Sequence, residues 1–259
     1  MMTLKRCTMK AIEKEVQDLY GKNQIIVDSF WEDHVLKSRV YQLMINDECV
    51  GFAGIFEEHT LMLFHLFEAY RQFGRQWMEE LKRMEQVTNA MIPTGDEFFL
   101  SHAMDNYQRL EKQAYFSLYR SEDLPREKEI ALELNEMNGE KGFEALKIAG
   151  DFFEEDTAER LTKEPHLKVY EVYNKEEFVG FGVIEYGRVV KDIASIGMFV
   201  VPEKRQQGYA RNILKHLQKH ASAKGYLVRS GCWYYNHNSL KSIISAGAYS
   251  QTRLLRIYF

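Results

Sequence analysis

The chain has 259 residues and a formal net charge of −4, with 45% hydrophobic and 13% aromatic residues. This composition predicts packed cores and excludes global disorder, and the length suits two domains. The acidic balance argues against a nucleic-acid partner held by bulk electrostatics, so none is expected.

The N-terminus and the cysteines indicate a compartment. The first ten residues lack the apolar core of a signal peptide, and apolar stretches such as 61–67 are far too short to span a membrane. We therefore expect a cytoplasmic protein without a membrane partner. The three cysteines, Cys7, Cys49 and Cys232, are odd in number and widely spaced, which predicts free thiols.

The N-terminal half is predicted to alternate strands with helices, although the region of Trp31 and His34 gives no clear pattern. In chain order we expect a strand at 3–5, a helix at 11–20, a hairpin of strands 40–45 and 49–56, a strand at 61–67 and a long helix at 69–87.

A polar stretch with a proline, 121–126, predicts a boundary between domains of residues 1–122 and 123–259. After it we expect helices at 127–137 and 151–161, a hairpin of strands 168–173 and 178–186, a strand at 196–201, a helix at 211–224, a strand at 227–232, a helix at 240–246 and a last strand at 252–259.

The turn between strand 196–201 and helix 211–224 predicts an anion site. Such a turn directs unpaired N–H groups and the positive end of the helix dipole toward one point. Gly208 lets the backbone approach a ligand closely, and Arg205 adds a fixed positive charge. We therefore expect an anionic cofactor.

Two motifs carry a resemblance to a known family. Arg205-x-x-Gly208-x-Ala210 is similar to the acetyl-coenzyme A signature of the GNAT superfamily of N-acetyltransferases, and Asn236-His-Asn-Ser239 followed by Gly247 resembles the second motif of that family. The resemblance implies acetyl-CoA as a co-substrate and no metal.

The same pattern occurs twice. The segment 46–54 parallels 174–182 with one inserted residue, and Arg71-Gln-Phe-Gly74 falls opposite Arg205-Gln-Gln-Gly208 at an offset of 134. We predict an α/β (α+β) fold of two tandem GNAT-like domains, each with a mixed, mostly antiparallel sheet flanked by helices.

The first copy departs from the signature. Gln76 stands where the motif has Gly or Ala, Glu68 replaces the proline, and 105–115 is a loose echo of the second motif. We therefore predict that the N-terminal copy binds no acetyl-CoA and instead serves in packing or in shaping the acceptor site.

In the second copy, the resemblance implies that the pantetheine arm lies along the cofactor strand and the diphosphate at the turn. Ser239 is also a candidate N-cap of helix 240–246, and Gly247 its C′ residue. The predicted cofactor-binding residues are Met198, Phe199, Val200, Arg205, Gln206, Gln207, Gly208, Tyr209, Ala210, Asn236 and Ser239.

Transfer to an amine needs a base, and the departing thiolate can use an acid. Glu185 and Asp192, at either end of the turn before the cofactor strand, are the candidate bases. Many GNAT members have a tyrosine that serves as the general acid four residues after the motif serine, where this chain has Ile243. Tyr235 is the candidate acid here, with Tyr234, Tyr249 and water as alternatives.

We predict transfer of an acetyl group to a primary amine of a small molecule or peptide. The alternatives are a non-catalytic acyl-CoA-binding or regulatory protein and aminoacyl transfer from charged tRNA. His216 and His220 have a spacing that can chelate zinc, but we assign them to a solvated helix face. The aromatic content is compatible with a homodimer.

Overall fold

The computed structural model describes residues 1–21, 25–119, 129–137 and 146–259. These form two compact units, and the predicted boundary between residues 122 and 123 lies outside the described residues. Unit 1 comprises Met1–Phe116, Trp233–Tyr235 and Gln251–Phe259, and unit 2 comprises Ser117–Cys232 and Asn236–Ser250.

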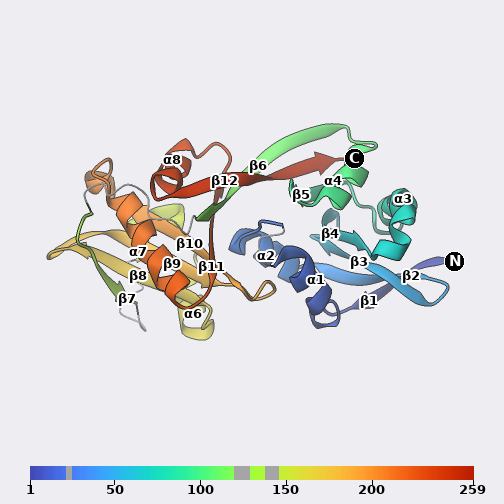
Figure 1. Ribbon diagram of the computed structural model, residues 1–259, viewed down its shortest axis with the longest axis horizontal. Helices are drawn as coiled ribbons and strands as arrows, with labels where there is room; N and C mark the ends of the chain where they lie inside the picture. Colours follow the sequence, from blue (N-terminus) through green and yellow to red (C-terminus); the bar gives the residue numbers. More distant parts are fainter. Residues whose placement is uncertain (22–24, 120–128, 138–145) are drawn as a thin grey trace. The chain divides into compact units, whose positions relative to one another are not determined.

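Unit 1 is a mixed sheet with helices (Figure 1). Its strand order is β1-β2-β3-β4-β5-β12, antiparallel except for the parallel pair β4 and β5. Its elements are β1 (Met2–Cys7), η1 (Met9–Ala11), α1 (Glu13–Tyr20), α2 (Ser29–Leu36), β2 (Arg39–Ile45), β3 (Glu48–Phe56), β4 (Thr60–Leu66), η2 (Glu68–Phe73), α3 (Gly74–Glu85), β5 (Asn89–Pro93) and α4 (Glu97–Met104).

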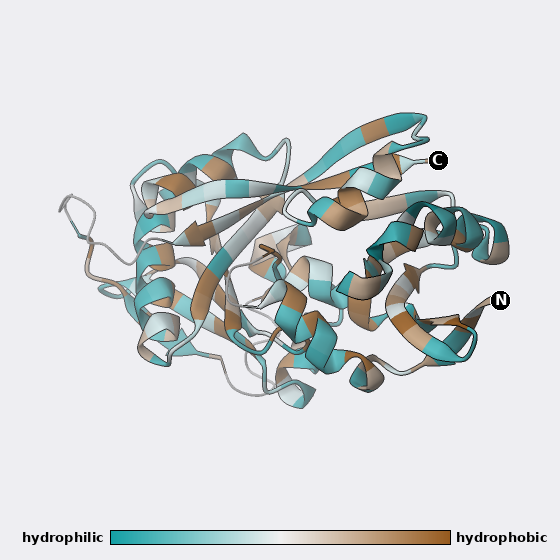
Figure 2. Cartoon of the chain, turned by 45° about the vertical axis from the view of Figure 1, so that its right-hand side comes forward, coloured by the Kyte–Doolittle hydropathy of each residue, from teal (hydrophilic) through white to brown (hydrophobic). Residues whose placement is uncertain are grey.

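The β2–β3 hairpin shows how the local sequence sets this fold. Asn46 and Asp47 have φ angles of 48° and 68°, which a tight hairpin turn between twisted strands requires. The core lies where α3 and α4 pack on the sheet, around Phe64, Trp77 and Phe99. In Figure 2 the helices carry hydrophobic and hydrophilic residues together, as amphipathic helices do.

Unit 2 repeats this order, with its strands arranged β11-β10-β9-β8-β7. The pair β10–β11 is parallel and the other pairs are antiparallel. Its elements are β7 (Glu133–Glu136), η4 (Lys147–Phe152), α6 (Thr157–Lys163), β8 (Leu167–Asn174), β9 (Glu177–Tyr186), β10 (Ile193–Val200), η5 (Pro202–Lys204), α7 (Tyr209–Ala223), β11 (Leu227–Trp233) and α8 (His237–Ser245).

Both faces of the unit 2 sheet are covered. On one face α7 packs so closely that a Cβ placed on Gly182 would lie 3.1 Å from the Leu217 side chain. The neighbouring Phe181 belongs to a separate apolar cluster with Ala149 and Leu167. Because successive strand residues face opposite ways, η4 and α7 cover opposite faces.

Two strands run from one unit into the other, β6 (Arg109–Tyr119) and β12 (Ala248–Tyr258). The C-terminal part of β12, from Leu254 to Tyr258, pairs antiparallel with β5 inside unit 1. The last strand of the sequence therefore completes the sheet of the first unit.

Most predicted elements are present, but two differ. The predicted helix 151–161 is interrupted after Phe152, and α6 begins only at Thr157. Within the predicted helix 127–137, Glu133–Glu136 forms β7, which pairs antiparallel with β8. Helix-forming Glu and Leu residues adopt the extended form here because the edge of β8 offers a hydrogen-bonded ladder. The region of Trp31, which gave no pattern, forms α2, capped by the Asp28 carboxylate.

Candidate functional site

Unit 2 contains a cavity of about 680 Å³ between the C-terminal end of β10, the N-terminus of α7 and α8. Ten of the eleven predicted cofactor-binding residues line it, and Gln207 does not. Its lining residues are Ala149, Asp151, Phe152, Met198, Phe199, Val200, Lys204, Arg205, Gln206, Gly208, Tyr209, Ala210, Arg211, Asn236, Asn238, Ser239, Lys241, Ser242 and Ser245.

The two central strands separate next to this cavity. β10 and β11 pair only from Ile193 to Ser195, whereas β9 accompanies β10 up to Val200. Just past the last pair, the Ser230 hydroxyl donates to the Ile196 carbonyl at 2.8 Å. Beyond it, the β11-facing edge of β10 has no strand partner among the described residues, and an extended ligand could hydrogen-bond there.

The turn before α7 has the backbone that an anion site needs. Gln206 and Gly208 have φ angles of 61° and 86°, and Gly208 is the residue before the first turn of α7. This left-handed conformation costs little for glycine and more for other residues. The guanidinium Nε of Arg205 donates to the Val200 carbonyl at 3.0 Å, which ties the turn to the end of β10.

Asn212 supports the turn through two hydrogen bonds, and the sequence analysis did not identify this residue. Its side chain is 2% exposed, its amide donates to the Gly208 carbonyl at 2.9 Å, and its Oδ1 accepts from the Ile130 N–H at 3.1 Å. Asn212 directly precedes the core residues Ile213 and Leu214, and a polar residue on the buried side of a helix was the available signal.

The start of α8 differs from the prediction. The Asn236 side chain accepts from the Ser239 N–H at 3.1 Å, so Asn236 is the N-cap and Ser239 lies in the first turn. The predicted capping role of Ser239 is therefore wrong. Gly247 follows the C-cap with a φ angle of 102°, which confirms it as C′. Ile243 is 3% exposed and packs in the core.

The charge of the cavity suits a polyanion. Among the described residues, four cationic side chains and one carboxylate, Asp151, line it. The cations are Lys204, Arg205, Arg211 and Lys241. Together with the N-terminal dipole of α7, they would attract phosphate groups.

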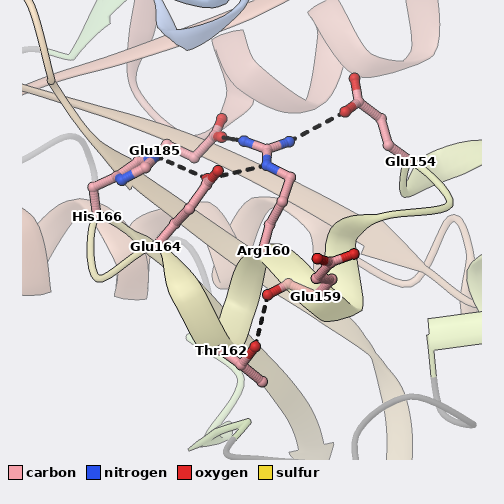
Figure 3. A network of polar contacts seen from close by, with 7 residues as sticks. All are labelled: Glu154, Glu159, Arg160, Thr162, Glu164, His166 and Glu185. Carbon is pink, nitrogen blue, oxygen red and sulfur yellow. Dashed lines mark hydrogen bonds and ion pairs between the residues drawn. The ribbon is translucent and has the colours of Figure 1, made fainter.

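Glu185, the candidate base, lies on β9 in an ion-pair network (Figure 3). Its carboxylate accepts from Arg160 on α6 at 3.4 Å, and Arg160 also binds Glu154 and Glu164. Glu185 does not line the cavity in unit 2. Arg160 therefore anchors the Glu185 carboxylate, and the role of Glu185 as a base stays a prediction.

Tyr235, the candidate acid, belongs to unit 1 and is 54% exposed. Its ring centroid lies 5.0 Å from that of Trp233 and 5.2 Å from that of Tyr234. The pKa of Tyr234 is lowered by hydrogen bonds with Tyr115 and Lys112. The acid role of Tyr235 stays a prediction.

Unit 1 has a smaller cavity, about 420 Å³, at the corresponding place. His65 and Arg71 line it at an offset of 134 from Phe199 and Arg205, and Asp96 caps α4 as Asn236 caps α8. The predicted echo at 105–115 is therefore wrong: that segment runs from the end of α4 into β6, and Asp96 holds the equivalent position.

In unit 1 the corresponding turn is helical. Gly74 has helical angles, φ −55° and ψ −48°, so η2 runs directly into α3 without a left-handed residue. A Cβ on Gly74 would lie 2.1 Å from Nε2 of His102, which fills the space beside the glycine. Gln76, the departure noted in the sequence, is exposed on α3.

Within the described ranges, no group of three or more His, Cys, Asp or Glu side chains could hold a metal ion. Cys7, Cys49 and Cys232 form no disulfide with one another. None of the described helices has the length and apolar character needed to cross a membrane.

Comparisons with known families identify both halves. Residues 8–120 match the family described as Acetyltransferase (GNAT) domain, and residues 131–242 match the Acetyltransferase (GNAT) family. The chain belongs to the GNAT superfamily. It carries two GNAT domains in tandem, as the sequence predicted, and membership implies acyl-CoA-dependent acetyl transfer. No curated protein matches the chain.

Solved structures share the fold. An acetyltransferase of the GNAT family from Colwellia psychrerythraea has a TM-score of 0.83 at 16% identity, over 100% of this chain and 99% of that one. A GCN5-related N-acetyltransferase from Sphaerobacter thermophilus has a TM-score of 0.61 at 12% identity, over 99% and 94%. A tandem GNAT protein from the clavulanic acid biosynthesis pathway has 0.61 at 10%, over 99% and 98%.

Proposed function

We propose that this GNAT protein is an N-acetyltransferase that binds acetyl-CoA in unit 2 and transfers the acetyl group to a primary amine of a small molecule or peptide. The observation that carries the proposal is the cavity at the left-handed turn of Gly208. It combines a helix N-terminus, an excess of cations and an open strand edge. Phosphate groups and an extended amide arm need these three features together.

The chain's own residues would divide the work in this reaction. The turn around Gly208 and the cations would hold the diphosphate. Backbone groups of Met198 to Val200 would hold the pantetheine arm beside the separated strands. Amine attack needs loss of a proton, for which Glu185 is the candidate, and Tyr235 or water would protonate the thiolate.

The test is release of free CoA from acetyl-CoA when a panel of primary amines is offered to the full-length chain. The proposal expects release above the hydrolysis background with at least one amine, and the N-acetyl product in the mass spectrum. Acetylation of hydroxyl compounds with no amine product would contradict the N-acetyl assignment.

One observation favours a second function, a non-catalytic acyl-CoA-binding or regulatory protein. Ile243, at the place of the family's acid, is buried in the core and offers no proton. This alternative predicts saturable acetyl-CoA binding with no CoA release for any amine in the panel. The two functions therefore separate in a single pair of assays.

A further inference from the structure

The cavity of unit 1 differs from the cofactor cavity in size, shape and charge. Its volume is about 420 Å³ against about 680 Å³, and His102 occupies the side of Gly74. Carboxyl groups of Asp96 and Glu97 line it, and they would repel phosphate groups. The cavity is therefore unsuited to CoA but large enough for a smaller molecule.

One fixed cation, Arg71, lines this cavity, next to the Phe98 ring and within electrostatic reach of Asp96 and His65. Arg71 is exposed, and among the described residues its guanidinium group forms no ion pair. The two lining histidines do not supply further charge at neutral pH, because burial lowers the pKa of His102 and lowers that of His65 to about 4. Arg71 is thus a site for one carboxylate, which a guanidinium group can bind bidentately.

Two carboxyl groups, those of Asp96 and Glu97, line the same cavity as Arg71. The Asp96 carboxyl group is 2% exposed and already accepts from Tyr20 Oη at 2.8 Å and from the Phe99 N–H at 3.1 Å. Glu97 is exposed, and its carboxylate forms no ion pair with the described residues. Arg71 attracts the Asp96 carboxylate but forms no ion pair with it within 4 Å, and a simple anion bound to Arg71 would leave Glu97 unmatched, whereas a zwitterion satisfies both Arg71 and Glu97.

Part of the remaining wall is apolar, next to Ser101 and the two histidines. Leu19, Ile25 and Phe98 line the cavity beside these charges. The Phe98 ring lies 5.8 Å from the Arg71 guanidinium carbon, so apolar surface adjoins the carboxylate-binding group directly. A ligand that presents an ammonium group, a carboxylate and a short apolar side chain matches all three features.

We propose that the unit 1 cavity, lined by Arg71, Glu97 and Phe98, binds a free amino acid with an apolar side chain. Arg71 holds the carboxylate, Glu97 attracts the ammonium group, and Phe98 packs on the side chain. This site is independent of the acetyl-CoA cavity in unit 2.

The experiment uses the full-length chain with L-leucine as the probe. Calorimetry measures affinity, and NMR follows the titration of His65, whose pKa is lowered by burial and then by the charge of Arg71. A carboxylate on Arg71 screens that charge, so leucine is expected to raise the His65 pKa. Leucinamide and N-acetylleucine each lack one charge and are expected to bind at least about tenfold more weakly.

Arg71→Gln is expected to abolish the leucine response. The matched control is Arg75→Gln, which removes an exposed arginine of the same segment that does not line the cavity, and should respond as wild type. An unchanged His65 titration at millimolar leucine would overturn the proposal. So would an equal response in Arg71→Gln, or equal binding of N-acetylleucine.

Discussion

The two copies share one topology but differ at the turn that follows their fourth strand. In unit 2 the chain passes through left-handed angles at Gln206 and Gly208 and leaves a cavity at the start of α7. In unit 1 the chain enters α3 directly at Gly74, and His102 fills the space. A shared Arg-x-x-Gly pattern is therefore not enough to give a left-handed turn with a cavity beside it, because the backbone angles and the neighbouring side chain differ.

The largest effect should come from Gly208→Val. A β-branched residue at a φ angle of 86° is strained by about 1–2 kcal/mol, so the turn would rearrange and turn its N–H groups away. We expect acetyl-CoA affinity to fall at least about 100-fold by calorimetry.

A matched control is Gly225→Val at the other end of α7. Gly225 has nearly the same φ angle, 87°, and a Cβ there would meet nothing within 4 Å. Both variants should lose stability, but only Gly208→Val should lose binding. Equal binding losses would mean that strain alone, and not the turn, explains the effect.

The second prediction concerns Glu185, which has no carboxylate counterpart in unit 1, where Phe56 follows Ile55 as Glu185 follows Ile184. If Glu185 is the base, Glu185→Gln lowers kcat/KM by about 100-fold or more and flattens its pH profile. Glu154→Gln, which removes a more exposed partner of Arg160, should leave kcat/KM within about twofold. Similar kinetics for both variants would reduce Glu185 to an anchor of α6.

The third prediction concerns Asp96→Asn, which gives α4 of unit 1 the same N-cap residue type that α8 of unit 2 has. Burial raises the pKa of Asp96 to about 6 from 3.8, so its stabilising contribution is complete below about pH 3.8 and is lost as the pH rises through about 6. The amide keeps the cap and the Tyr20 contact without this loss. We expect the stability of the variant relative to wild type to rise by about 2 kcal/mol between pH 4 and 7 in urea unfolding.

His65 acts in the opposite direction. Burial lowers its pKa to about 4 from 6.5, so its contribution to stability grows as the pH rises through that interval. In wild type, the effects of Asp96 and His65 on the pH dependence of stability oppose each other. Asp96→Asn should therefore show a net rise in stability with pH. Parallel stability profiles of variant and wild type would contradict the raised pKa of Asp96.

The smallest effect should be the coupling between Gly74 and His102. Alanine at Gly74 improves helix propensity by up to about 1 kcal/mol but places Cβ against the His102 ring. We expect Gly74→Ala to be neutral or destabilising alone and stabilising in a His102→Ala background, a coupling of about 1–2 kcal/mol in denaturant unfolding. Additive effects would mean that His102 does not fill this space tightly.

Much of the fold and of the candidate site could be predicted from local sequence patterns. Gly208, Pro202 and the apolar spacing of α7 specify strand, turn and helix within a few residues of each other, and the hairpin turn at Asn46 is equally local. The repeat extended these predictions to the first half. The expectation that the three cysteines form no disulfide also followed from their spacing.

What could not be predicted depends on contacts between distant segments. Nothing near Gly74 indicates that His102, 28 positions later, lies beside it. The strand Glu133–Glu136 forms because β8 offers an edge, against its local helix preference. Asn212 reveals its role only once its bonds to Gly208 and Ile130 are seen.

The most direct test of the difference between the copies is the stoichiometry of acetyl-CoA binding to the full-length chain, measured by calorimetry. We predict one site per chain in wild type and none in Gly208→Val. Two sites per chain, or one site that survives in Gly208→Val, would contradict the assignment of the cofactor to unit 2.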